Sequence, residues 1–122
     1  MNKVILVVDD YAKNLKLAGD LVQAWGYGVL TAVNGKEAVD LARKEKPDLI
    51  LMDLRLPVMD GFTATQQIRA SDEASKIPII MLTSSAMKGD EERVKKSGCD
   101  HYMSKPFDII ELRKIVEGFL RK

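Results

Sequence analysis

The stretch KPDLILMDLRLPVMDG, residues 46–61, contains the pattern that decides the fold. Four apolar residues, 49–52, run directly into a carboxylate at Asp53. A short apolar run of this kind is typical of a strand that is buried on both faces of a parallel sheet. Because burying a lone carboxylate is costly, we expect Asp53 to have partners from other parts of the chain.

Similar apolar runs alternate with helical patterns on both sides of this stretch. The expected strands are 4–8, 28–33, 48–52, 77–82 and 101–104. Apolar residues that recur every three or four positions predict helices at 12–25, from 34–35 onward, from 60 to 70, at 88–97 and at 107–120. Asn34 and Glu37 have the spacing of a capping box at the start of the second helix. Strands that alternate with helices in this way predict an α/β fold with a parallel sheet and right-handed crossovers.

Length and composition exclude several classes of function. A chain of 122 residues fits one domain, 1–122, and its 46% hydrophobic and 30% charged residues are typical of globular proteins. The net charge of +1 gives no reason to expect binding to nucleic acid. The chain lacks both a signal peptide and an apolar run of about 20 residues, so we expect a cytoplasmic protein without a membrane anchor. Its single cysteine, Cys99, is interpreted as a small buried residue.

Polar residues follow four of the expected strands at the point where each ends. Asp9 and Asp10 follow the first strand, Asp53 the third and Thr83 the fourth, and Lys105 lies just after the fifth. The carboxyl ends of parallel strands share one edge of the sheet, where ligands bind in α/β folds. Each residue alone has an ordinary explanation, as a helix-start acid, a turn residue or a solvated cation. Their coincidence at four strand ends favours a common site.

This set of side chains indicates a particular chemistry. Clustered carboxylates repel one another, so such a cluster either raises a pKa or recruits a cation. Mg²⁺ prefers hard oxygen ligands and commonly combines one or two carboxylates with phosphate oxygens. One histidine and one cysteine in the whole chain disfavour a zinc site. With a lysine and a threonine nearby, the set resembles a site for phosphoryl transfer, in which a carboxylate can be the nucleophile.

Four segments carry a family resemblance. VVDD, LILMDLRLPVMDG, IIMLTSSA and YMSKPF resemble, in order and spacing, the response regulator receiver domains of the CheY-like superfamily, the phosphoacceptors of two-component signalling. The resemblance covers essentially the whole chain and implies a flavodoxin-like (βα)5 fold with strand order 2-1-3-4-5. The run AMKGDEERVKKSGCDHYMSKP is similar to stand-alone division-control receivers and to receivers attached to hybrid kinases.

The resemblance also implies how phosphorylation occurs. Asp53 would accept a phosphoryl group from the phosphohistidine of a histidine kinase or a phosphotransfer protein. Asp9, Asp10, Asp53 and the main-chain carbonyl of Arg55 would hold Mg²⁺. The protein would catalyse only its own phosphorylation and dephosphorylation and would not otherwise be an enzyme.

A conformational switch is implied as well. Thr83 and Lys105 would contact the phosphoryl oxygens, and Tyr102 matches an aromatic that turns inward when the threonine moves, although core packing explains Tyr102 equally well. Pro106 matches a proline whose preceding peptide bond is typically cis. A downstream protein would bind the face made by 88–97, 101–104 and 107–120. The chain is expected to be a monomer or a weak dimer.

Three other functions stay open at this point. A Mg²⁺-dependent phosphatase of the haloacid dehalogenase type needs a second acid two residues after its nucleophile, where this chain has Arg55. A flavodoxin-like electron carrier needs a hydroxyl- and glycine-rich phosphate loop where this chain has Asp9 and Asp10. A degenerate receiver would be an interaction surface only, although every expected site residue is present.

Overall fold

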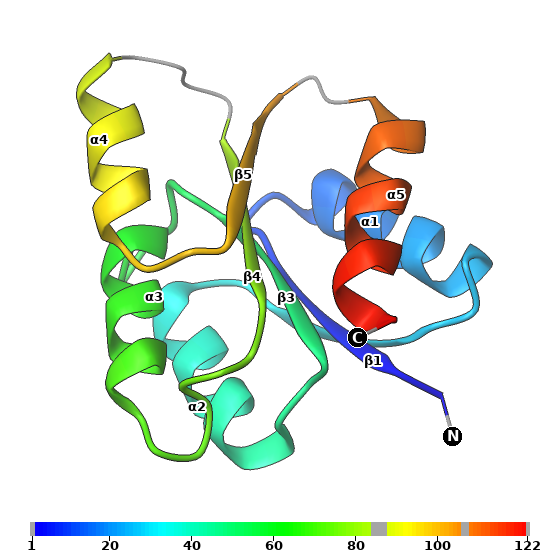
Figure 1. Ribbon diagram of the computed structural model, residues 1–122, viewed down its shortest axis with the longest axis horizontal. Helices are drawn as coiled ribbons and strands as arrows, with labels where there is room; N and C mark the ends of the chain where they lie inside the picture. The colour runs from blue at the N-terminus through cyan, green and yellow to red at the C-terminus, as the bar shows by residue number, and fades with distance from the viewer. Residues whose placement is uncertain (1, 84–87, 106–107, 122) are drawn as a thin grey trace.

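The computed structural model describes residues 2–83, 88–105 and 108–121, and in these ranges it has one parallel sheet with helices on both faces (Figure 1). The strands are β1 (Val4–Val8), β2 (Gly28–Ala32), β3 (Leu49–Asp53), β4 (Ile79–Thr83) and β5 (His101–Ser104). The helices are α1 (Ala12–Ala24), α2 (Gly35–Glu45), α3 (Gly61–Ala70), α4 (Lys88–Lys96) and α5 (Ile109–Leu120). The strand order is β2-β1-β3-β4-β5, which confirms the predicted fold class and topology.

The strand and helix boundaries differ from the sequence prediction by a few residues, for reasons that the hydrogen bonds show. Asp48 precedes β3 and is bonded to Val4 twice, since its N–H donates to the Val4 carbonyl and its carboxylate accepts the Val4 N–H, both at 2.8 Å. β4 begins after Pro78, which has no N–H to donate, although its carbonyl accepts the Ile50 N–H at 2.9 Å. α5 begins after Asp108, which caps it with its side chain.

The start of α2 has the predicted capping box. The side chain of Asn34 accepts the Glu37 N–H at 2.8 Å, and the Glu37 carboxylate accepts the Val33 N–H at 3.1 Å. The next helix, α3, has an equivalent cap, since Asp60 accepts the Thr63 N–H at 2.8 Å. These caps fix where both helices begin, and both beginnings lie beside the carboxyl ends of the strands.

The core consists of two layers, one on each face of the sheet. Leu6 and Val8 of β1 pack on the side of α2, α3 and α4, whereas Ile5 and Val7 pack on the side of α1 and α5 (Figure 1). Cys99 is only partly buried against the first layer, so the prediction of a buried thiol was too strong. Within the described ranges, no helix has the length and apolar character needed to span a membrane.

Candidate functional site

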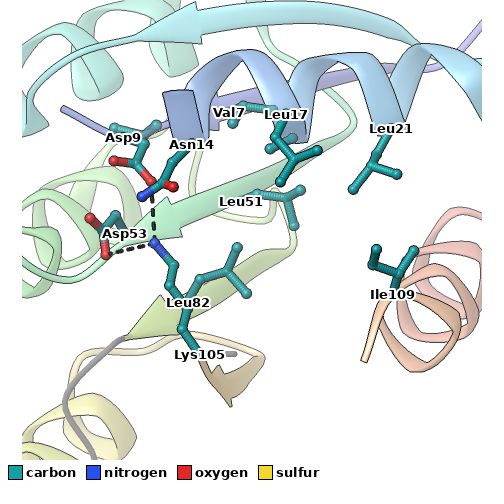
Figure 2. A pocket seen from close by; sticks show the side chains of 12 residues that line it. Val7, Asp9, Asn14, Leu17, Leu21, Leu51, Asp53, Leu82, Lys105 and Ile109 are labelled. Carbon is teal, nitrogen blue, oxygen red and sulfur yellow. Dashed lines mark hydrogen bonds and ion pairs between the residues drawn. The ribbon is translucent and has the colours of Figure 1, made fainter. Parts of the chain in front are cut away.

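The sheet delivers the predicted site residues to one edge. Asp53 and Thr83 are the last residues of β3 and β4, while Asp9 and Lys105 directly follow β1 and β5. The ladder continues past β5, since the Lys105 N–H donates to the Thr83 carbonyl at 2.6 Å. Figure 2 shows the side chains of Asp9, Asp53 and Lys105 pointing toward one another from three different strand ends. The prediction that these residues meet is therefore confirmed.

Three carboxylates form a cluster at this edge. Oxygens of Asp9, Asp10 and Asp53 all lie within 4.8 Å of one another. Asp9 is buried at 6% exposure, Asp53 is partly buried, and Asp10 is exposed to solvent. Two oxygens bound to the same octahedral Mg²⁺ at about 2.1 Å lie about 3–4 Å apart, so a small contraction of this cluster would make all three residues ligands. The donor set of hard oxygens therefore fits Mg²⁺.

Lys105 supplies the positive charge of the site. Its Nζ donates to Asp9 Oδ2 at 3.2 Å and lies 3.7 Å from Asp53 Oδ1 (Figure 2). The lysine side chain is 20% exposed, so these ion pairs are only partly screened by water. Among the described residues, this one ammonium pairs with two of the three carboxylates, so the cluster keeps excess negative charge, which favours binding of a cation.

Burial raises the pKa of the Asp53 carboxyl above its usual value. The Lys105 ammonium lowers the pKa and is the second-largest influence, followed by the Asp9 carboxylate, which raises it. Smaller effects come from the Leu54 N–H, which lowers the pKa, and from Asp10, which raises it. Asp53 Oδ1 accepts the Leu54 N–H at 2.9 Å and faces Lys105. From the part of the chain that the structure describes, no hydrogen bond or ion pair reaches Asp53 Oδ2, so this oxygen can bind a ligand.

Thr83 and Tyr102 lie on the same face of the sheet. Thr83 is buried at 3% exposure and shares its strand face with Met81, two residues before it. Tyr102 is the register partner of Met81 and packs, half-buried, against the core layer of α2, α3 and α4. The two residues are thus on adjacent strands, and their places agree with the predicted switch pair. Pro106 lies outside the described residues.

The site also includes features that the sequence patterns did not indicate. Asn14, in the first turn of α1, points toward Asp9 (Figure 2). A cavity of about 480 Å³ opens beside the cluster between α1 and α5, with a mostly apolar lining that includes Leu17, Leu21 and Ile109. The loop of residues 54–60, which contains Arg55, connects Asp53 to α3 and contacts the start of α2. A pattern of apolar periodicity predicts none of these contacts.

The family model of the response regulator receiver domain matches residues 5–117. This chain belongs to that family, the phosphoacceptor switches of two-component signalling, whose members interact with histidine kinases and downstream targets. The matched range contains β2 to β5 and all of β1 except Val4, and it includes the positions of Asp9, Asp53, Thr83 and Lys105.

Both kinds of receiver expected from the sequence occur among the similar proteins. The polar-differentiation response regulator DivK of Brucella anthropi is 43% identical over 120 residues, which are 98% of this chain and 98% of that protein. The receiver domain of the sensor histidine kinase PA1611 of Pseudomonas aeruginosa, whose structure has a magnesium ion coordinated in the active site cleft, is 37% identical with full coverage of both chains and a TM-score of 0.93. The chemotaxis response regulator CheY4 of Vibrio cholerae is 31% identical, with 98% of this chain and all of that chain covered, at a TM-score of 0.89.

Proposed function

We propose that Asp53 of this receiver accepts a phosphoryl group from the phosphohistidine of a histidine kinase or phosphotransfer protein, in a reaction that requires Mg²⁺. The observation that carries the proposal is the meeting of Asp9, Asp10 and Asp53 within 4.8 Å of one another beside the Lys105 ammonium. The proposal takes further support from the PA1611 receiver, in whose active site cleft a magnesium ion is coordinated.

The chemistry follows from these side chains. Asp53 Oδ2 attacks phosphorus in line, the P–O bond forms as the N–P bond of phosphohistidine breaks, and the imidazole leaves. Asp9, Asp10, Asp53 and the Arg55 carbonyl would hold Mg²⁺, which when bound neutralises the charge on the phosphoryl oxygens. Lys105 is within reach of Asp53 and compensates the charge that the phosphoryl group adds.

Phosphorylation then changes the equilibrium between two conformations. New acceptor oxygens on Asp53 draw the Thr83 hydroxyl and the Lys105 ammonium toward the phosphoryl group. A shift of Thr83 opens space on the face that it shares with Tyr102, so the tyrosine turns inward and reshapes the surface of α4, β5 and α5. The phosphoryl group shifts the population only through these differential contacts. A downstream protein that binds this surface therefore has different affinities for the two conformations.

Further parts of the same proposal concern the protein as a whole. Residues 1–122 form a single receiver domain, consistent with the 98% mutual coverage with DivK. The chain catalyses only its own phosphorylation and dephosphorylation. It acts in the cytoplasm as a monomer or weak dimer, and it binds neither nucleic acid nor membrane.

Phosphorylation by acetyl phosphate and MgCl2, followed on Phos-tag gels, tests the proposal. The matched control is Asp48→Asn, a carboxylate at the opposite end of β3 from Asp53. Wild type and Asp48→Asn should give a retarded band that EDTA prevents, whereas Asp53→Asn should give none. Equal phosphorylation of Asp53→Asn and wild type would remove Asp53 from its role.

A further inference from the structure

The loop of residues 54–60, which follows the phosphoacceptor, rests against the first residue of α2. The Gly35 N–H, one of the amides that a helix start leaves without a partner inside the helix, donates to the Met59 carbonyl at 3.0 Å. Gly35 is buried. The two ends of the loop are joined, since the Gly61 N–H at the start of α3 donates to the Leu54 carbonyl at 2.8 Å.

The backbone of this loop has an unfavourable conformation. Val58 has φ of 68°, a value that is rare for a β-branched residue. Around it the Met59 N–H donates to the Pro57 carbonyl at 2.6 Å in a three-residue turn. The side chain of Val58 is 78% exposed, so its own packing does not hold the turn in place. Such strain persists only where the surroundings fix it, and Gly35 is part of those surroundings.

Glycine is required at position 35 because of close approach. A Cβ built there would overlap the Met59 carbonyl oxygen and lie 2.8 Å from the Met59 carbonyl carbon. The φ of Gly35 is outside the positive region, so the backbone conformation itself would accept alanine. Within a helix, alanine is ordinarily more favourable than glycine. The contact with Met59 is therefore the constraint that excludes a side chain.

A side chain at position 35 would displace the loop rather than the helix. α2 is anchored by the Asn34 cap and by Ala38 and Ala42, which are fully buried. Leu54, at the other end of the loop, is also fixed: it is 1% exposed and its N–H donates to the Leu82 carbonyl at 3.2 Å. We therefore expect a displacement of Met59 to change the backbone conformation of residues 55–58.

We infer that Gly35 is a positioning residue for the Mg²⁺ site. It acts through Met59 on the segment that carries the Arg55 carbonyl, and the inference rests on the proposed function, in which that carbonyl is a metal ligand. Gly35 itself touches neither metal nor phosphoryl group. Its role is to let α2 approach the loop closely enough to hold the strained turn.

Substitution at the start of α2 tests this role. Gly35→Ala places a methyl group against the loop, whereas the matched control Asn34→Ala removes the cap without adding atoms there. Isothermal titration calorimetry measures the Mg²⁺ dissociation constant, and urea denaturation measures stability. We expect Gly35→Ala to weaken Mg²⁺ binding about 10-fold or more and Asn34→Ala to change it less than about twofold.

Phosphorylation by acetyl phosphate provides an independent readout. In Gly35→Ala the Mg²⁺ concentration for half-maximal rate should rise, while the rate at saturating Mg²⁺ stays close to that of wild type. Mg²⁺ affinity equal to wild type in a folded Gly35→Ala protein overturns the inference. An equal loss of affinity in Asn34→Ala also overturns it, because Gly35 would then act only through stability.

A measurement on wild type keeps the inference testable if Gly35→Ala does not fold. During an NMR titration with Mg²⁺, the amide resonance of Gly35 should shift with the same midpoint as that of Leu54. A Gly35 amide that does not respond while Leu54 does would overturn the inference. If the wild type neither binds Mg²⁺ nor becomes phosphorylated, it is the proposed function that fails.

Discussion

Replacing Asp53 by asparagine is expected to stabilise the metal-free protein although it removes the phosphoacceptor. Burial raises the pKa of the Asp53 carboxyl, so its ionised form is less favourable in the folded state than in the unfolded state. Asparagine has nearly the same shape and keeps an oxygen that can accept the Leu54 N–H. The substitution therefore removes a buried charge without removing this hydrogen bond.

The distances set the size of the effect. With an effective dielectric constant of about 20, repulsion between Asp9 and Asp53, whose facing oxygens lie within 4.8 Å, is at least about 3.5 kcal/mol, and attraction between Lys105 and Asp53 at 3.7 Å is about 4.5 kcal/mol. These opposing terms nearly cancel. What remains is the cost of burying the carboxylate and a screened repulsion from exposed Asp10, so the expected gain in unfolding free energy is about 1 kcal/mol.

Urea denaturation at pH 7 in EDTA measures this gain, and Asp48→Asn is again the control, with an expected change below about 0.5 kcal/mol. The pKa of Asp53 is higher in the folded state than in the unfolded state, so its ionised carboxylate destabilises the fold. This destabilisation decreases as the pH falls through the folded pKa, and the difference in unfolding free energy between wild type and Asp53→Asn therefore narrows. In excess Mg²⁺ wild type gains binding free energy that the variant largely lacks, so the order of stabilities reverses. An Asp53→Asn protein less stable than wild type in EDTA would refute this reasoning.

Other substitutions and a chemical probe give further predictions. Arg69→Met should lower the free energy of unfolding by about 3 kcal/mol, because Arg69 donates to three main-chain carbonyls and one carboxylate. In the same urea assay, Arg43→Met should lower it by less than about 0.5 kcal/mol, because Arg43 is exposed. Gly118→Ala should raise the free energy of unfolding by about 0.5–1 kcal/mol, because the space around its Cβ is open. Gly98→Ala should lower it, because a φ of 95° is strained for any residue with a side chain. Partial burial raises the pKa of the Cys99 thiol, so at pH 8 it should react with Ellman's reagent more slowly than free cysteine, and an equal rate would contradict this effect of burial.

Much of the fold and site could be predicted because both follow from local patterns. The apolar run before Asp53 identifies a buried parallel strand, and parallel strands bring their carboxyl ends to one edge whatever the details of packing. This is why Asp9, Thr83 and Lys105 could be placed beside Asp53 from their positions at strand ends alone. The cap at Asn34 was predictable for the same reason, since its signal lies within four residues.

The parts that could not be predicted depend on contacts between distant segments. The approach of Gly35 to Met59 joins residues 24 positions apart, and no periodicity signals it. The positive φ of Val58 runs against the preference of its residue type and is imposed by the folded surroundings. The apolar run begins at Ile77, but β4 begins at Ile79, where its pairing with β3 starts, and this register is set by the folded sheet rather than by the apolar pattern.

The central claim is that Asp53, and no other carboxylate, becomes an acyl phosphate. Borohydride reduces an acyl phosphate to an alcohol and would convert phosphorylated aspartate to homoserine. Wild-type protein phosphorylated with acetyl phosphate and Mg²⁺ should therefore give, after reduction and tandem mass spectrometry, homoserine at position 53. Homoserine at position 9 or 10 instead, or at no position in a sample that Phos-tag shows to be phosphorylated, would contradict the account.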